Sequence, residues 1–165
     1  MRQAAVLLLV VPVIGGCGGG GGGRLSRSEF DSKGNAVCAK YNAKERKVPR
    51  PKSLDDLSPA LRKLLELNKS ELDELGKLEP PKSDQAAFDR ILQGARAEND
   101  VVEHQLIPAA QKRDAEKVRS LLQRLQLREN ELNDQASTLG LSTCAQPTAS
   151  AAPMGRRRSL AAYGS

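Results

Sequence analysis

Leucine and other aliphatic residues recur every three or four positions through most of the chain, and prolines interrupt that recurrence at a few points. The pattern is that of amphipathic helices, whose apolar side chains repeat with a period of about 3.6 residues. The predicted helices span about residues 26–47, 54–78, 83–112 and 114–139, and Ser58-Pro59 leaves a start of the second near residue 59 open. No segment alternates between apolar and polar residues as a half-buried strand would. Four amphipathic helices joined by short breaks pack most simply as an antiparallel bundle, so the sequence predicts an all-α four-helix bundle.

The ends of the predicted helices carry residues that cap helices. Capping side chains are expected at Ser26, Ser53, Ser83 and Asp114. Glu29, three residues after Ser26, completes a capping box at the first of them. Gly140 followed by Leu141 is typical of a helix end, with a glycine stop and its apolar partner. Pro108 lies inside the third segment, where we expect a kink and a stop near residue 112.

The first sixteen residues have the organisation of a signal peptide. Met1-Arg2-Gln3 gives a short cationic start, and an eleven-residue apolar run extends from Ala4 to Ile14. The run is too short to span a bilayer, which requires about 20 apolar residues. Pro12 would also interrupt a spanning helix. We therefore expect residues 1–16 to direct export rather than to form part of the fold.

Ile14-Gly15-Gly16-Cys17 resembles the lipobox of bacterial lipoproteins. The resemblance implies cleavage between Gly16 and Cys17 and lipid attachment to the Cys17 thiol, with the protein held outside the cytoplasm at the cell membrane. Diacyl or triacyl chains anchor stably, at about 0.8 kcal/mol per buried methylene. The six glycines that follow make residues 17–25 a flexible tether with a reach of roughly 13 Å. Two alternatives stay open, a secreted protein in which Cys17 is incidental and a cytosolic protein with an unusual N-terminus.

Two further cysteines, Cys38 and Cys144, lie in the predicted bundle domain, residues 26–144. An even pair in an oxidising compartment predicts a disulfide. The bond would close a loop of over 100 residues, for which chain entropy gives a stabilisation of about 4.7 kcal/mol. The alternative is two buried thiols.

The net charge of +6 does not indicate a nucleic-acid-binding protein. Arg2 leaves with the signal and Arg156-Arg157-Arg158 lie in the C-terminal tail, so 22 of the 26 basic side chains remain against 20 acidic ones. The domain is nearly neutral and has few aromatic residues for base stacking. Residues 145–165 are rich in Ala, Ser, Pro and Gly and are expected to be disordered. Their arginine triplet could contact anionic lipid or wall polymer, or could simply be solvated.

A wider resemblance covers most of residues 14–144. It consists of the lipobox, the glycine tether, an early helical cysteine, the Pro80-Pro81 break and the ending Leu139-Gly140-Leu141-x-x-Cys144. Together these features resemble small, uncharacterised bacterial lipoproteins, many of them actinobacterial. The resemblance implies an anchored, disulfide-tied helical domain and brings no catalytic residues.

The sequence predicts no catalytic residue, metal ligand or cofactor. His104 is the single histidine, and on a helical wheel it faces away from the predicted core. The usual zinc, di-iron and c-type haem spacings are absent. Carboxylates at helical spacing, such as Glu71 with Glu74, or Glu129 with the amide of Asn133, are expected on a solvated charged face, because a bundle this small offers little cleft.

These observations favour a lipid-anchored, non-catalytic module that binds an envelope protein or a wall component through its helix faces. Leu127, opposite the apolar stripe of the last helix, is a candidate contact together with Leu67 and Leu78. The alternative is a binding module for an apolar small ligand held between the helices. A filled core would exclude the alternative, and an open apolar cavity would count against the first hypothesis. Titratable groups buried in a pocket would reopen the case for an enzyme.

Overall fold

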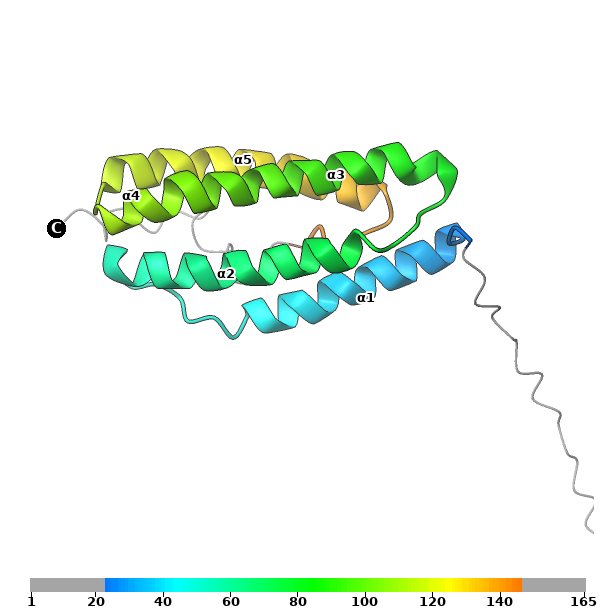
Figure 1. Cartoon of the computed structure of the whole chain (residues 1–165), viewed down its shortest axis with the longest axis horizontal. Coiled ribbons are helices and arrows are strands. Elements are labelled where there is room, and N and C mark those ends of the chain that lie inside the picture. The colour runs from blue at the N-terminus through cyan, green and yellow to red at the C-terminus, as the bar shows by residue number, and fades with distance from the viewer. Residues whose placement is uncertain (1–22, 147–165) are drawn as a thin grey trace, which may run out of the picture.

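The computed structural model describes residues 23–146. They form α1 (Arg27–Glu45), α2 (Leu54–Leu75), α3 (Lys82–Val101), the π-helical turn η1 (Val102–Leu106), α4 (Ile107–Gln111) and α5 (Ala115–Thr138). α3, η1 and α4 follow one another without a break and make one rod (Figure 1). These residues contain no strand, so the predicted all-α four-helix bundle is confirmed.

Several predictions fall on residues outside the described range. They are the signal peptide 1–16, the cleavage between Gly16 and Cys17, lipid attachment at Cys17, most of the glycine tether, and the tail from residue 147 with its arginine triplet. Among the described helices, none combines the length and the apolar character needed to cross a membrane.

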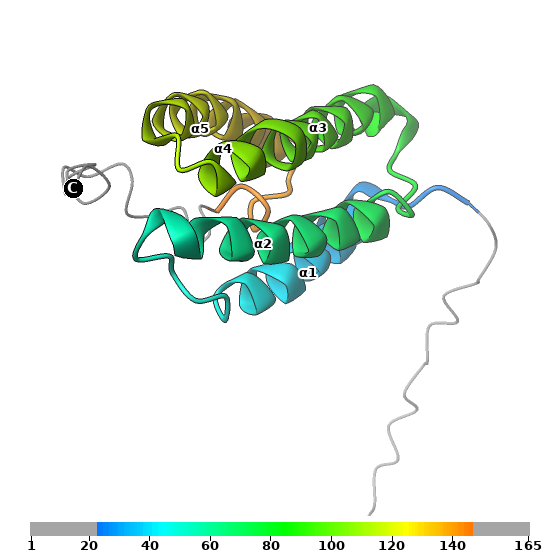
Figure 2. The same cartoon turned by 60° about the vertical axis from the view of Figure 1, so that its left-hand side comes forward.

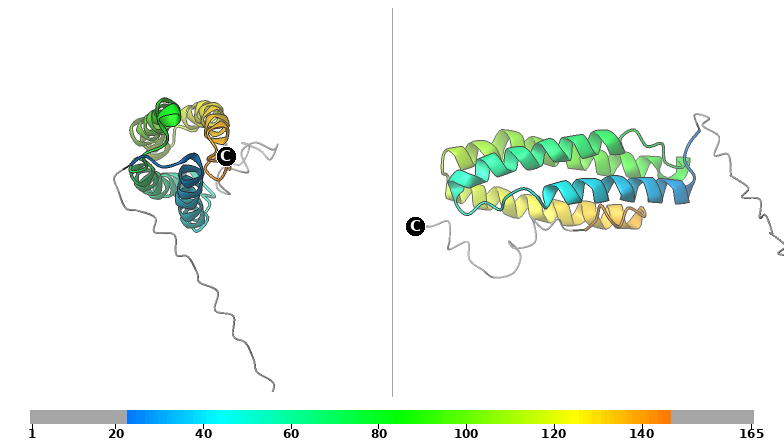
Figure 3. Two further views of the ribbon diagram at one scale, coloured as in Figure 1. Left: turned by 90° about the vertical axis from the view of Figure 1, so that its right-hand side faces the viewer. Right: turned by 90° about the horizontal axis from the view of Figure 1, so that it is seen from below.

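The helices form two layers, one of α1 and α2 and the other of the α3–α4 rod and α5 (Figures 2 and 3). The Leu25 amide donates to the Glu79 carbonyl, and the Tyr41 hydroxyl donates to the Glu74 carboxylate. These bonds place the short α1 along the C-terminal half of α2. The N-terminal half of α2 packs on α4 instead.

The caps follow the sequence with one exception. Ser26 forms the complete capping box with Glu29, and the side chains of Ser53 and Asp114 each accept a backbone N–H at the start of α2 and α5. The prediction that Ser83 caps α3 is wrong. The residue before the helix is Pro81, whose ring fixes a φ compatible with a helix start, so α3 begins earlier and the Ser83 hydroxyl donates to the Asp84 carboxylate.

The third predicted helix passes Pro108 and ends at Gln111, close to the predicted stop. The irregularity lies one turn earlier, in the π turn η1, where the Ile107 N–H donates to the Val102 carbonyl five residues before it. A π turn is wider than an α-turn. Because proline lacks an N–H and crowds the carbonyl four residues before it, the wider turn lets the helix accommodate Pro108.

The C-terminal segment, residues 139–146, crosses back against α1 and lies between the two layers (Figure 2). The predicted disulfide is confirmed, with Cα atoms of Cys38 and Cys144 5.0 Å apart. Asn35 donates to the Gly140 carbonyl and accepts from the Thr143 amide, at 2.9 and 2.7 Å. This segment therefore fills the space between α1 and α5.

The apolar core is divided into two clusters. The disulfide-end cluster comprises Phe30, Val37, Cys38, Tyr41, Leu72, Leu75, Phe88, Leu92, Ala136, Leu139 and Leu141. The far-end cluster comprises Leu57, Leu106, Ala109, Ala110, Val118 and Leu121. The rings of Phe30 and Phe88 meet edge to face at 5.0 Å in the first cluster. The middle of the bundle, between the clusters, is where the structure departs from a simple filled core.

Candidate functional site: an acidic cavity in the bundle

A cavity of about 340 Å³ lies between the layers, lined by residues of α1, α2, α3, η1, α5 and the C-terminal segment. Leu72 and Leu75 of the disulfide-end cluster line it, and so does Leu106 of the far-end cluster. One water occupies about 30 Å³ of liquid volume, and small-molecule sites begin at about 300 Å³. The cavity is therefore large enough for a small organic molecule.

Each of the four long helical rods contributes one glutamate to the lining. They are Glu45 of α1, Glu71 of α2, Glu98 of α3 and Glu129 of α5. Within the described chain they are the only titratable side chains in the lining, since Cys144 is in the disulfide. Glu45 is only 5% exposed. None of the ion pairs formed within residues 23–146 involves any of the four.

Burial raises the pKa of all four carboxyl groups, and at Glu45, Glu71 and Glu98 the charge of a neighbouring glutamate raises it further. The pKa of Glu45 rises from an ordinary value of 4.5 to about 7, through burial first and the charge of Glu129 second. The pKa of Glu71 rises to about 8, again through burial and then through the charges of Glu45 and Glu74. Desolvation penalises the charged form of an acid, and a like charge nearby does the same.

The other two glutamates behave in the same way. Burial and the charge of Glu129 raise the pKa of Glu98 to about 7, against a smaller opposite effect of Arg128. Burial raises the pKa of Glu129 itself. Near neutral pH Glu45, Glu71 and Glu98 are therefore partly protonated.

Asparagines accompany the glutamates around the cavity. Asn42, Asn68, Asn99 and Asn133 all line it. Asn99 is 6% exposed, and its Nδ2 has no hydrogen-bond partner. The Oε1 atom of the adjacent Glu98 is likewise buried without a partner. An unsatisfied buried polar group costs about 1–3 kcal/mol, so this end of the cavity has both a donor and an acceptor available to a ligand.

The expectation of a solvated carboxylate face holds for Glu74 and is wrong for Glu71, Glu129 and Asn133. Glu74 is half-exposed and pairs with Lys40 at 2.6 Å. The other three side chains line the cavity. The physical reason is the C-terminal segment, which lines the cavity through Cys144 and Gln146 and separates α1 from α5. Because the segment keeps α1 and α5 apart, the helix faces that carry Glu71, Glu129 and Asn133 border the cavity.

One signal in the sequence could have identified half of the site. Asn42-Ala43-Lys44-Glu45 on α1 and Asn68-Lys69-Ser70-Glu71 on α2 share the spacing Asn-x-x-Glu. Residues three apart lie on the same helix face, so the repeat places an amide and a carboxyl group side by side on two helices. On α5, Gln126-Leu127-Arg128-Glu129 has the related spacing Gln-x-x-Glu, whereas no such spacing marks Glu98.

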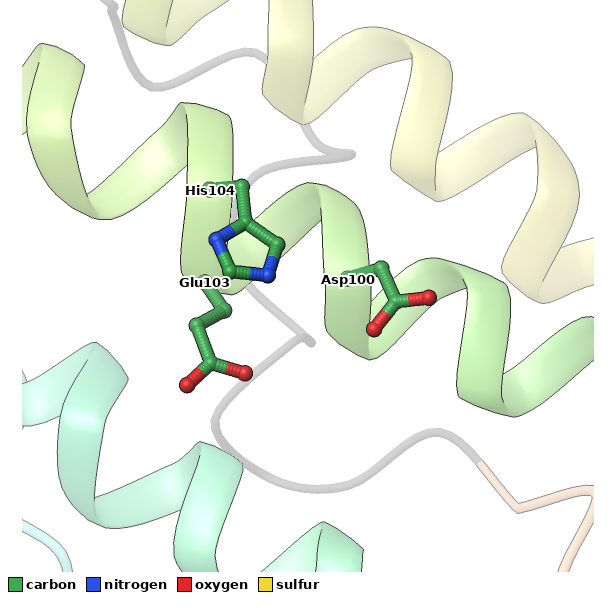
Figure 4. Close-up of side chains that lie close together, drawn as sticks. All are labelled: Asp100, Glu103 and His104. Atoms are coloured by element: carbon green, nitrogen blue, oxygen red, sulfur yellow. The ribbon is translucent and has the colours of Figure 1, made fainter.

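His104 is exposed, as predicted, and belongs to a different cluster. Its ring, Asp100 and Glu103 offer ligand atoms within 4.8 Å of one another along one face of α3 and η1 (Figure 4). Glu103 is already paired with Lys69 of α2 at 2.5 Å, which lowers its pKa. We interpret this cluster as a surface ion-pair group, because exposed acidic side chains commonly gather without a metal.

Comparison of the chain with protein-family models, with curated proteins and with solved structures finds no match.

Proposed function

We propose that the protein is a lipid-anchored, extracytoplasmic binding protein that holds a small ligand in the cavity between its helices. The observation that carries this proposal is the 340 Å³ cavity with its unpaired buried polar atoms. The export signal and the lipobox-like Ile14-Gly15-Gly16-Cys17 support the location. The proposal follows the alternative that the sequence left open, with a ligand that has polar groups as well as an apolar surface.

Binding without catalysis fits the lining better than an enzyme does. Buried titratable groups with raised pKa values are present, and such groups can transfer protons. However, the lining consists of glutamate, asparagine, glutamine, aliphatic residues and the disulfide cysteine. The described part of the cavity therefore offers no hydroxyl, lysine or histidine nucleophile.

The hypothesis of a partner-binding helix face has less support. Leu127 is 72% exposed and is the only large apolar side chain exposed among residues 23–146. Leu67 and Leu78, the other candidate contacts, pack against the disulfide-end cluster. One exposed leucine is ordinary on a soluble surface. An interaction with an envelope protein or wall polymer therefore stays a prediction, second to the cavity.

The test is to purify the full-length protein from membranes of the cells that produce it and to measure its mass under native conditions. A bound small molecule should add mass that is lost on denaturation. Ala95→Phe places a ring in the cavity, because Ala95 lines it, and should abolish the added mass. Ala97→Phe, on the exposed side of the same helix, is the matched control and should retain it. The proposal fails if no molecule copurifies, or if Ala95→Phe and Ala97→Phe retain it equally.

A further inference from the structure

We infer that the ligand is an organic polycation of the alkyl polyamine class, whose ammonium groups pair with Glu45, Glu71, Glu98 and Glu129 while its methylene groups lie against the aliphatic lining. This inference rests on the proposed function and specifies its ligand. The four glutamates come from all four rods of the bundle, and among residues 23–146 the lining contains no cation to balance them.

The sign of the ligand charge follows from the unpaired carboxyl groups. A buried carboxylate is costly unless a cation or several hydrogen-bond donors accompany it. Glu45 is almost completely buried, and Glu98 has a buried oxygen without a partner. Ammonium groups carry three donors each and no acceptor. They would supply the positive charge and the hydrogen-bond donors that the carboxyl groups lack, whereas the unpaired Asn99 Nδ2 needs an acceptor that an ammonium group does not offer.

The spacing of the carboxyl groups favours an organic cation over a metal ion. Calcium and magnesium bind oxygen at about 2.0–2.6 Å, so the ligands of one ion lie within about 5 Å of one another. Among residues 23–146 the only group that meets a 4.8 Å limit is Asp100, Glu103 and His104, outside the cavity. The glutamates are near enough to raise one another's pKa, but no three of them converge on one ion.

The apolar part of the lining indicates what joins the charges. Leu61, Leu64 and Leu65 of α2 line the cavity, opposite Leu122 and Leu125 of α5. A metal ion with its waters would leave these side chains against water. A polyamine alternates ammonium groups with short methylene segments, so it can offer cations to separate carboxylates and apolar surface to the leucines between them.

Binding should release protons, because a cation favours the ionised form of each glutamate. The charged groups facing them are few. Glu74 faces Glu71 and is itself paired with Lys40, and Arg128 acts weakly on Glu98. Affinity should therefore increase from about pH 6 to about pH 8, because the pKa values of Glu45, Glu71 and Glu98 without a ligand lie at about 7 to 8.

The test is calorimetric titration of the full-length protein in non-ionic detergent with spermidine, with 1,5-diaminopentane, with magnesium and zinc chloride, and with 1-hexanol as the uncharged probe. Spermidine should bind at least tenfold more tightly at pH 8 than at pH 6. Its heat should differ between phosphate and Tris buffers in proportion to the protons released. Glu129→Gln should weaken binding at least tenfold, whereas Glu131→Gln, at an exposed position on the same helix, should not.

Several outcomes would overturn the inference. They are tight binding of a metal ion without amine binding, equal affinities of Glu129→Gln and Glu131→Gln for spermidine, or an affinity independent of pH. If 1-hexanol binds and the amines do not, or if the molecule that copurifies with the native protein is uncharged, the polycation inference fails and the proposed ligand-binding function stands. If Ala95→Phe changes neither the mass that copurifies nor the affinity for spermidine, the proposed function and the polycation inference both fail.

Discussion

The charge of Glu129 on α5 raises the pKa of Glu45 on α1, although the two residues belong to opposite layers of the bundle. Both side chains line the cavity, and neither forms an ion pair within residues 23–146. Folding thus brings like charges together in a partly dry space. The ligand-free protein should be least stable where these groups are ionised, and the following predictions use that relationship.

Glu45→Gln should stabilise the ligand-free protein at about pH 8, by about 1–3 kcal/mol. The wild-type carboxyl, with a pKa of about 7, is mostly ionised there, whereas glutamine is neutral and nearly the same shape. At about pH 5 the wild-type carboxyl is protonated when folded, so the gain should largely vanish. Urea unfolding followed by far-UV circular dichroism measures the free energy of unfolding at both pH values. If Glu45→Gln changes this free energy equally at pH 5 and pH 8, the raised pKa of Glu45 is contradicted. Glu131→Gln should leave the free energy of unfolding unchanged at either pH.

The stability of the ligand-free wild type should fall as pH rises from about 4.5 to about 8. Glu45, Glu71 and Glu98 have folded-state pKa values of about 7 to 8 against 4.5 when unfolded. In that interval the folded state binds more protons than the unfolded state, so raising the pH favours unfolding. The lowered pKa values of Glu29 and Glu103 act in the opposite direction, but below pH 4.5. A melting temperature that rises steadily over this interval would contradict the account.

Loss of the Cys38–Cys144 bond should destabilise the domain by about 4 kcal/mol. The bond joins residues 106 positions apart, and chain entropy predicts about 4.7 kcal/mol for a loop of that size. It also holds the segment that lines one side of the cavity. Urea unfolding of the oxidised and the reduced protein gives this difference in the free energy of unfolding. Cys38→Ala and Cys144→Ala, each compared with the oxidised wild type, measure it a second time. A difference below 1 kcal/mol would show that the hydrogen bonds of Asn35 hold the segment without the disulfide.

Gly140→Ala should cost about 1–3 kcal/mol. Gly140 has a φ of +86°, a conformation that disfavours L side chains by about 1–2 kcal/mol, and an added Cβ would also crowd the Asp31 carboxylate. The residue lets the Leu141 amide reach the Ala136 carbonyl at 2.9 Å. Ser142→Ala, exposed in the same segment, should be nearly neutral. Similar unfolding free energies for the two variants would contradict this role.

Cys17→Ala should release the protein from the membrane fraction of the cells that produce it. The thiol is the predicted site of lipid attachment, and without acyl chains the short apolar run leaves no stable anchor. Cell fractionation measures the release from the membrane, and metabolic labelling with a radioactive fatty acid measures the loss of the acyl chains. Cys38→Ala should remain labelled and membrane-bound. Labelling of Cys17→Ala at the wild-type level would remove the lipoprotein assignment.

The sequence predicts the bundle because its signals are local. Leucine periodicity, the capping box at Ser26, the caps at Ser53 and Asp114 and the Gly140 stop act within one helix or one turn, and the structure confirms them. The failure at Ser83 is local too, since Pro81 competes with serine for the start of α3. The π turn before Pro108 depends on how one helix accommodates a missing N–H, which the proline alone does not specify.

The cavity could not be predicted in the same way. A glutamate beside an asparagine on a helix has the same local pattern whether it faces water or an enclosed space. What encloses Glu71 and Glu129 is the return of residues 139–146 between α1 and α5, a contact between distant parts of the chain. Only the amide-x-x-Glu spacing that ends at Glu45, Glu71 and Glu129 is visible beforehand.

The most direct test of the acidic cavity is the titration of its carboxyl groups by carbon-13 NMR of the glutamate side chains, assigned with single Glu→Gln variants. Without ligand, Glu45 and Glu98 should titrate near pH 7 and Glu71 near pH 8, far from the ordinary 4.5. Saturation with spermidine should shift all three midpoints downward. Midpoints near 4.5 in the ligand-free protein would show that these glutamates are solvated, and would contradict both the cavity and the cation site built on it.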